Sequence, residues 1–202
     1  MPRPKKTPAQ LEATREQILD TALAILQESG PETITSRAIA ERMGVAHMSL
    51  YTYFENQAAI LHALSLREIL NWRTRQQVFD QRAETEAIPS VVTDLLRFFI
   101  AFARENPNLY RLAWVMPEVG GETPAENRQR MQATVGQLAV LLQKGMEAGD
   151  FEPRNPFLAA GTVLAMVNAP YILFHSGKIV DPSLRDQMVE EVLVAALGYL
   201  QK

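Results

Sequence analysis

The sequence predicts an all-α protein, and two observations carry this prediction. Helix starts recur in one style, a capping side chain followed by proline at the first helical position. No alternating run of apolar and polar residues bounded by hairpin turns competes with them. The capped starts are Thr7-Pro8, Asn106-Pro107, Thr123-Pro124, Asn155-Pro156 and Asp181-Pro182. We therefore expect helices over roughly 8–29, 36–43, 47–54, 57–82, 89–105, 107–115, 124–148, 156–176 and 182–200.

Soon after the first helix, the sequence predicts two short helices joined by a glycine turn. Thr35 is a natural N-cap for the first of them, and Gly44 permits the positive φ at which that helix stops. The second helix is too short to be stable alone, so it must pack through Leu50 and Phe54, which share a face. We expect Val45 to fill the angle between the two helices.

This pair of helices is typical of a helix-turn-helix unit, whose second helix lies in the major groove of DNA. The first residues of that helix are placed to contact base edges, and the later ones to contact phosphates. The predicted base contacts are His47, Met48 and Ser49, and the predicted phosphate contacts are Tyr51, Thr52 and Tyr53. Helix N-termini offer further hydroxyls and amides to phosphates. The residues at these termini are Thr35, Ser36, Asn56 and Gln57.

The order of these segments resembles the DNA-binding domain of TetR-type transcriptional regulators over about residues 8 to 66. The motifs that carry the resemblance are TREQILDTALAILQESG, then TSRAIA, then GV and then LYTYF. The resemblance implies a homodimer in which residues 1–56 bind a palindromic operator and residues 57–202 form a helical effector-binding and dimerisation domain. The chain departs from the usual family residues at Ala46, His47, Met48 and Gln57, which bears on the operator sequence and not on the fold.

Composition excludes several other classes of protein. A chain of 202 residues with 47% hydrophobic and 21% charged residues is long enough to bury a core and is typical of a soluble folded protein. The absence of cysteine excludes disulfides and cysteine-ligated metals. The chain does not open on a basic and then apolar signal sequence, so we expect a cytoplasmic protein.

Net charge favours DNA binding only at the start of the chain. The formal charge is −3, and residues 1–56 carry six Lys and Arg against seven Asp and Glu. Because phosphate neutralisation drives most DNA binding, we expect the acidic residues to face away from the duplex. Residues 1–7 form a short basic arm. The arm is interpreted either as a loose electrostatic contact to DNA or as an untethered terminus.

The segment 156–174 is uncharged throughout and long enough to raise the possibility of a membrane span. Gly161, Asn168 and Pro170, together with the lack of a second such segment, favour a buried helix over a membrane helix. A helix that is apolar on all sides can pack on its own domain and also on a second subunit. With the apolar stripe of the last helix, this predicts a four-helix homodimer interface through the helices near 156–176 and 182–200.

A set of aromatic side chains with a few polar tips is predicted to lie between the C-terminal helices. Such a mixture suits a site for a small apolar or aromatic effector, and it also suits a plain hydrophobic core, which the residue types favour for each residue taken singly. The candidate ligand-binding residues are Phe98, Phe102, Tyr110, Trp114, Met116, Asn168, Tyr171 and His175.

No signature of catalysis or of nucleotide binding occurs in the chain. The histidines at 47, 62 and 175 are scattered, so we expect no metal site, no cofactor and no enzymatic activity. The sequence therefore predicts a cytoplasmic, sequence-specific transcriptional regulator, most simply a repressor that leaves its operator when a ligand binds. The alternative is a helical ligand-binding or scaffolding dimer without specific DNA binding.

Overall fold

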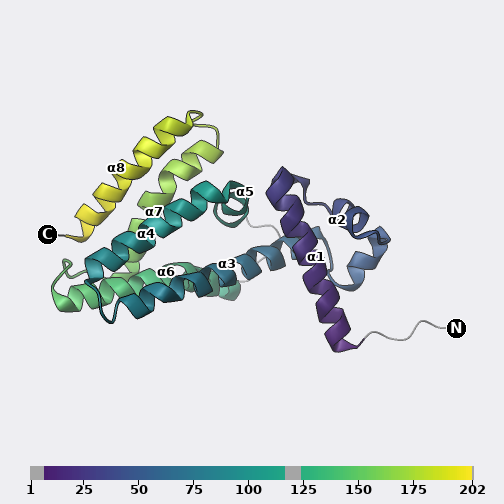
Figure 1. Ribbon diagram of the computed structural model, residues 1–202, viewed down its shortest axis with the longest axis horizontal. Helices are drawn as coiled ribbons and strands as arrows, with labels where there is room; N and C mark the ends of the chain where they lie inside the picture. The colour runs from purple at the N-terminus through teal and green to yellow at the C-terminus, as the bar shows by residue number, and fades with distance from the viewer. Residues whose placement is uncertain (1–6, 117–123, 202) are drawn as a thin grey trace.

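The computed structural model describes residues 7–116 and 124–201, and the described residues form helices and no strand (Figure 1). The predicted all-α class is therefore confirmed. The N-terminal part contains α1 (Pro8–Ser29), η1 (Pro31–Thr33), α2 (Ser36–Met43) and η2 (His47–Thr52). The remainder contains α3 (Gln57–Arg82), α4 (Ile88–Glu105), α5 (Pro107–Tyr110), η3 (Arg111–Val115), α6 (Pro124–Ala148), α7 (Pro156–His175) and α8 (Pro182–Leu200).

The predicted capping chemistry is confirmed at three helix starts. Thr7 and Gln10 form a capping box at α1, with the side chain of each accepting from the backbone of the other. The Asn155 side chain accepts from Leu158 N at α7, and the Asp181 carboxylate accepts from Ser183 N at α8. These bonds satisfy amides that have no partner inside the helix.

Asn106 does not cap the helix that follows it. Its side chain makes no capping hydrogen bond to α5 and instead donates to the Phe102 carbonyl at 3.3 Å. Asn106 thus closes the end of α4, where the last carbonyls also lack partners. The remaining predicted cap, Thr123 before Pro124, lies outside the described residues.

Two predicted α-helices are wrong in type. The segment 47–54 forms a 3₁₀-helix over His47–Thr52. A segment this short can form only a few of the i to i+4 hydrogen bonds of an α-helix, and Ala46 has no side-chain oxygen to cap its start. The segment 107–115 divides into one α-turn and the π-helix η3. A π-turn is rare and often lies at a functional position.

In the turn between α2 and η2, the predicted helix stop at Gly44 is confirmed, whereas the predicted packing of Val45 between the helices is wrong. Gly44 adopts a left-handed conformation with φ of 66°. Its amide and that of Val45 both bond back to the last turn of α2, which is the usual closure of a helix at glycine. This closure turns Val45 outward, leaving it 41% exposed, so it does not fill the angle between the helices.

Two hydrophobic cores are joined through the connecting segments. The N-terminal core contains Ile18, Leu26, Ile39 and Leu50, and it continues into the first turns of α3. The C-terminal core joins the far end of α3 to α4, α6, α7 and α8. Helix α3 therefore belongs to both cores and runs from one end of the elongated molecule towards the other (Figure 1).

The segment formed by α5 and η3 also belongs to both cores. Leu109 and Leu112 are buried in the N-terminal core, whereas Tyr110 is buried in the C-terminal core. Polar contacts reinforce this junction: Arg111 forms an ion pair with Glu32 of η1. The two parts of the molecule are thus connected by one long helix and one short apolar segment.

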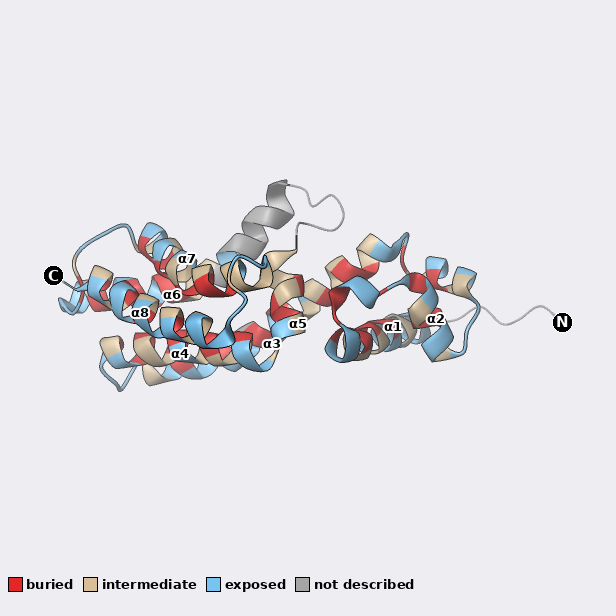
Figure 2. Ribbon diagram, turned by 90° about the horizontal axis from the view of Figure 1, so that it is seen from above, coloured by how far each residue is buried: buried red, intermediate tan, exposed pale blue. Residues whose placement is uncertain are grey.

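Helix α7 is the one helix among the described residues that is long and apolar enough to cross a membrane. About 39% of its most apolar stretch is buried. Its remaining surface lies beside α8 on the outside of the C-terminal part, as the burial colours show (Figure 2). Leu158, Ala165 and Ile172 are exposed there at intervals of one heptad, and Val194 is exposed on α8.

Two glycines of α6 provide a matched test of core packing. A Cβ at Gly145 would lie 2.4 Å from the Phe151 ring, whereas a Cβ at Gly136 would meet nothing within 4 Å. We expect Gly145→Ala to lower the free energy of unfolding by about 1–3 kcal/mol through overpacking. We expect Gly136→Ala to raise it by about 0.5–1 kcal/mol, because alanine loses less backbone entropy in a helix. Urea unfolding followed by circular dichroism, at one protein concentration, measures both; equal effects would contradict this packing.

Candidate nucleic-acid interface

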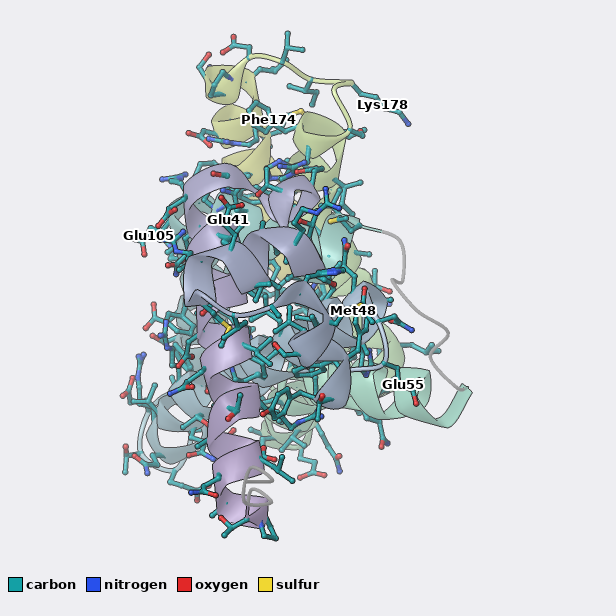
Figure 3. The ribbon with its side chains drawn as sticks, turned by 90° about the vertical axis from the view of Figure 1, so that its right-hand side faces the viewer. Glu41, Met48, Glu55, Glu105, Phe174 and Lys178 are labelled. Atoms are coloured by element: carbon teal, nitrogen blue, oxygen red, sulfur yellow. The ribbon has the colours of Figure 1, made fainter. Side chains whose placement is uncertain are left out.

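The η2 helix presents an exposed outer side and a buried inner side at the N-terminal end of the molecule. Leu50 and Phe54 are buried beneath it, as the sequence predicts, while Met48 is 71% exposed and Tyr51 is 40% exposed. The end view shows Met48 on this surface (Figure 3). The edge of the His47 ring packs against the Tyr51 ring, with centroids 5.3 Å apart. This geometry leaves a thioether and a phenol free to reach a partner.

Arg15 of α1 supports the end of η2 from behind. Its guanidinium donates to the Tyr53 carbonyl and lies 4.2 Å from the centroid of the Phe54 ring. A part-buried carbonyl at the end of a short helix thereby gains a charged donor. The sequence analysis missed this role because Arg15 is 38 residues from Tyr53 and no local pattern links them.

Arg42 holds α2 against α1. Both of its terminal nitrogens contact the Glu28 carboxylate, at 2.5 and 2.6 Å. These hydrogen bonds lower the pKa of Glu28. Because the pair is exposed, its main effect is to fix the geometry of the two helices rather than to add much stability.

Several predicted phosphate and base contacts make local bonds in the structure. The Thr35 hydroxyl accepts from Ala38 N at 3.0 Å, and the Ser49 hydroxyl donates to the Ala46 carbonyl. Ser36 is only 4% exposed, so its hydroxyl does not reach the surface. Thr52 is exposed and Tyr53 is half-buried.

The start of α3 is capped in the same manner. The Asn56 side chain accepts from Ala59 N at 2.8 Å, and the Gln57 amide donates to the Ile34 carbonyl at 2.8 Å. Gln57 thus ties α3 to the segment before α2. These two side chains stabilise the three-helix unit whether or not a phosphate contacts them.

Charge around η2 is mixed. Glu41 and Glu55 lie on the same end of the molecule as Met48 (Figure 3), so the acidic residues are not confined to the side away from η2. Arg37 is exposed on α2. The basic arm lies outside the described residues except for Thr7.

The predicted ligand-binding residues do not form one open site. Tyr110, Tyr171 and Asn168 are buried together, and the Tyr110 hydroxyl donates to Asn168 Oδ1 at 2.6 Å. The Tyr171 hydroxyl donates to the Ile100 carbonyl. Burial raises the pKa of Tyr110, so its phenol stays neutral as a hydrogen-bond donor. His175 lies beside Tyr110, and its buried Nε2 has no hydrogen-bond partner among the residues that the structure describes.

The other rings of that set extend the same cluster, since Phe102 contacts both Trp114 and Trp72. Trp114 stacks on Tyr110 with centroids 5.5 Å apart, Phe98 stacks on Trp72, and Met116 packs against the N-terminal core. Phe102 lines a cavity between the two parts of the molecule. Beside Trp114 and Trp72 the C-terminal core encloses a space of only about 30 Å³, roughly one water molecule.

Within the described residues, no group of three or more His, Asp or Glu is arranged to hold a metal ion.

Comparison with known proteins places these features in a family. Residues 18–64 match the family described as bacterial regulatory proteins, tetR family. The class A tetracycline repressor from transposon 1721 of Escherichia coli is 29% identical over 136 residues, which cover 66% of this chain and 56% of the repressor. The chain thus matches only about half of the length of this curated relative, which is a regulator and not an enzyme.

The whole fold also occurs in solved structures. A TetR-family transcriptional regulator from Pectobacterium atrosepticum superposes with a TM-score of 0.74 at 17% identity, covering 98% of this chain and 99% of that one. FadR from Bacillus subtilis, solved with stearoyl-CoA, gives a TM-score of 0.69 at 17% identity, covering 92% and 99%. Residues 18–64 therefore belong to the TetR family of bacterial regulatory proteins, and the whole chain shares the fold of a TetR-family transcriptional regulator.

Proposed function

We propose that this protein is a sequence-specific transcriptional repressor that binds a palindromic operator as a homodimer in the cytoplasm. The observation that carries the proposal is the outer side of η2, where Met48 and Tyr51 are exposed while Leu50 and Phe54 anchor the helix. Large exposed side chains on a short, firmly supported helix are what insertion into a major groove requires.

We assign base contact first to Met48, at the start of η2 where major-groove readers contact base edges. A thioether side chain suits apolar contact with the methyl group of thymine. Tyr51 and Thr52 follow in the helix and are placed for phosphates, together with the amides that open α2 and α3. His47 holds the Tyr51 ring in place through its edge contact. Ser49 and Gln57 are assigned supporting roles, since both already bond to carbonyls of their own domain.

The homodimer is proposed to form through α7 and α8. Both helices expose apolar side chains on the outside of the C-terminal part, including Leu158, Ile172 and Val194. Two copies of each helix would bury this surface in a four-helix arrangement. In this dimer the two η2 helices would have to lie on one side and about 34–36 Å apart, because successive major grooves have that spacing.

A small apolar or aromatic effector is proposed to act on the C-terminal core. Tyr110, Trp114 and His175 lie in contact there, and the neighbouring segment of α5 and η3 reaches into the N-terminal core through Leu109 and Leu112. A ligand that separates these rings would therefore move residues on which the DNA-binding domain packs. Relatives named as repressors, and a neighbour solved with stearoyl-CoA, support this kind of regulation. The effector must bind the two arrangements unequally to have any effect.

The charge around η2 favours one other function. Glu41 and Glu55, on the same end of the molecule as Met48 (Figure 3), suit a helical ligand-binding or scaffolding dimer that does not bind DNA specifically. Selection of bound fragments from a genomic library supplies candidate operators, and a salt titration then separates the two functions. For operator binding, log affinity should fall linearly with log salt, with a slope near −0.9 per phosphate contact. Equal affinity for selected and random duplexes would exclude the repressor function.

Met48 and Tyr51 should have separable effects on a selected operator. Met48→Ala should change the preference at one base position, with about 1–3 kcal/mol of discrimination lost there. Tyr51→Phe should weaken binding to every duplex by a similar factor, because a phosphate contact carries no sequence information. Fluorescence anisotropy against a panel of single-base operator variants distinguishes these outcomes. A uniform loss for Met48→Ala would remove its base-reading role.

The oligomeric state tests the α7 and α8 interface. Val194→Glu should convert the homodimer to a monomer, since burying an unpaired carboxylate in an apolar interface is unfavourable. Val180→Glu is the matched control, because Val180 is 82% exposed in the connection between α7 and α8, outside both helices. Light scattering coupled to size exclusion measures both masses. A dimer that survives Val194→Glu, or a control that dissociates equally, would place the interface elsewhere.

A further inference from the structure

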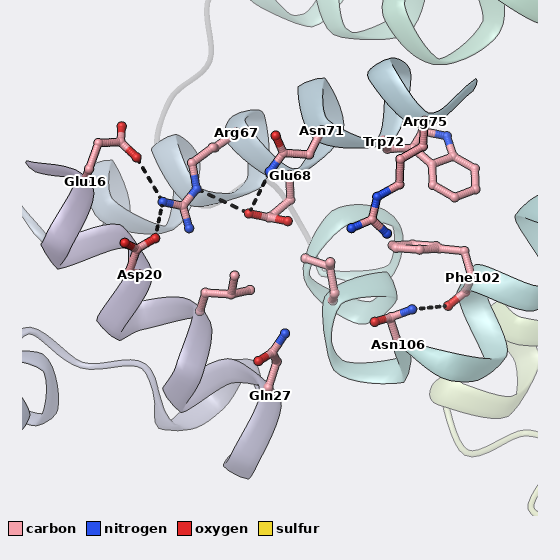
Figure 4. Close-up of a pocket in the computed structure, with 12 residues that line it drawn as sticks. Glu16, Asp20, Gln27, Arg67, Glu68, Asn71, Trp72, Arg75, Phe102 and Asn106 are labelled. Carbon is pink, nitrogen blue, oxygen red and sulfur yellow. Dashed lines mark hydrogen bonds and ion pairs between the residues drawn. The ribbon is translucent and has the colours of Figure 1, made fainter. Parts of the chain in front are cut away.

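A cavity of about 480 Å³ lies at the junction of the two domains, between α1, α3, α4 and the start of α5 (Figure 4). This volume falls in the range of small-molecule sites. Of the candidate ligand-binding residues predicted from the sequence, only Phe102 lines it. The cavity is distinct from the proposed effector site in the C-terminal core, where the enclosed space is far smaller.

The acidic residues of this junction cavity already have partners. Arg67 of α3 contacts Glu16 at 3.0 Å and Asp20 at 2.8 Å, both from α1, and it contacts Glu68 at 3.2 Å. Asn71 also donates to Glu68. The carboxylates at this end therefore hold α1 against α3, and their charge is already paired with Arg67.

Arg75, at the other end of the cavity, is a charged residue without a partner among the described residues. It makes no hydrogen bond or ion pair within the described part of the chain, although it carries five N–H donors. Its guanidinium points across the cavity towards Phe102 and Asn106 (Figure 4). An unpaired guanidinium in a concave site matches the geometry of a carboxylate, which it can bind through two parallel hydrogen bonds.

The wall next to Arg75 is aromatic and rigid. The Trp72 ring is stacked on Phe98 at 4.6 Å between centroids and packs against Phe102 at the same distance. Leu109 of α5 and Leu23 of α1 complete the apolar lining. A flat apolar group bound here would contact elements of both domains, with its charged end at Arg75.

We propose that the junction cavity is a binding site for a small aromatic carboxylate. The carboxylate pairs with Arg75, and the ring packs between Phe102 and the leucines of α1 and α5. Because the bound ring would contact α1 and α5 together, binding would change the relative orientation of the two domains. The effect on operator affinity rests on the proposed repressor function, whereas binding itself does not.

Binding is tested with benzoate as the probe, by calorimetry or ligand-observed NMR on the full-length protein. Benzoate should bind the wild type, and Arg75→Gln should weaken it about tenfold or more, the usual loss when a charged hydrogen-bonded pair is removed. Benzamide should bind correspondingly weakly. Arg97→Gln is the matched control, because Arg97 is exposed on α4, likewise has no partner within the described residues and does not line the cavity. It should leave benzoate binding unchanged.

Three results would overturn the site. They are no benzoate binding at millimolar concentration, equal binding to wild type and Arg75→Gln, or tighter binding of benzylamine than of benzoate. Circular dichroism of both arginine variants checks that they fold as the wild type does. A loss of binding in a folded variant can then be assigned to the cavity. Loss of benzoate binding on Trp114→Phe with Arg75→Gln unaffected would move the site to the C-terminal core.

The regulatory effect is measured separately, as the affinity for a selected operator with and without benzoate. Saturating benzoate should change the operator affinity of the wild type by about fivefold or more, which is the low end of allosteric couplings. It should not change the operator affinity of Arg75→Gln. Unchanged affinity in the wild type, with benzoate bound, would overturn the regulatory role. Failure to select any operator would count against the repressor function and would leave the binding result intact.

Discussion

The burial of Leu109 and Leu112 in the N-terminal core is the interaction on which the rest of the structure depends. Both residues come from a short segment that begins after α4, yet they complete a core otherwise built from α1, α2, η2 and the first turns of α3. Tyr110 between them is buried in the other core. Since apolar burial is the main favourable contribution to folding, neither core is complete without this segment.

The two domains are therefore coupled by packing and by charge at the same place. The ion pair of Arg111 with Glu32 and the contacts of Arg67 with Glu16 and Asp20 flank the apolar contact from either side. Exposed ion pairs add little stability, but the contacts of Arg67 fix the angle at which α1 meets α3, and the Arg111 pair fixes η3 against η1. Because packed interfaces tend to be bistable and not continuously deformable, a ligand at this junction would have a defined second arrangement to select.

The surface around η2, which we propose contacts DNA, shows the same division between support and contact. Arg15 and Phe54 hold η2 from beneath, while Thr35, Asn56 and Gln57 satisfy backbone groups of the neighbouring helices. The side chains with no structural task on this surface are the large exposed ones, Met48 above all. With mixed charge nearby, affinity would depend on positioned contacts rather than on a broadly positive face.

The sequence by itself determined the helices, because their caps, glycine stops and apolar spacing are local. It placed α1, α2, α3 and α6 within the bounds that the structure shows, and it identified Leu50 and Phe54 as the buried side of η2. Only the tertiary structure decided that Arg15 supports Tyr53, that Ser36 is buried, that the aromatic ligand candidates pack into one cluster connected through Trp72 and that Arg75 faces an open cavity. These facts depend on residues far apart in the chain, whose meeting is set by packing between helices and leaves no mark on local sequence.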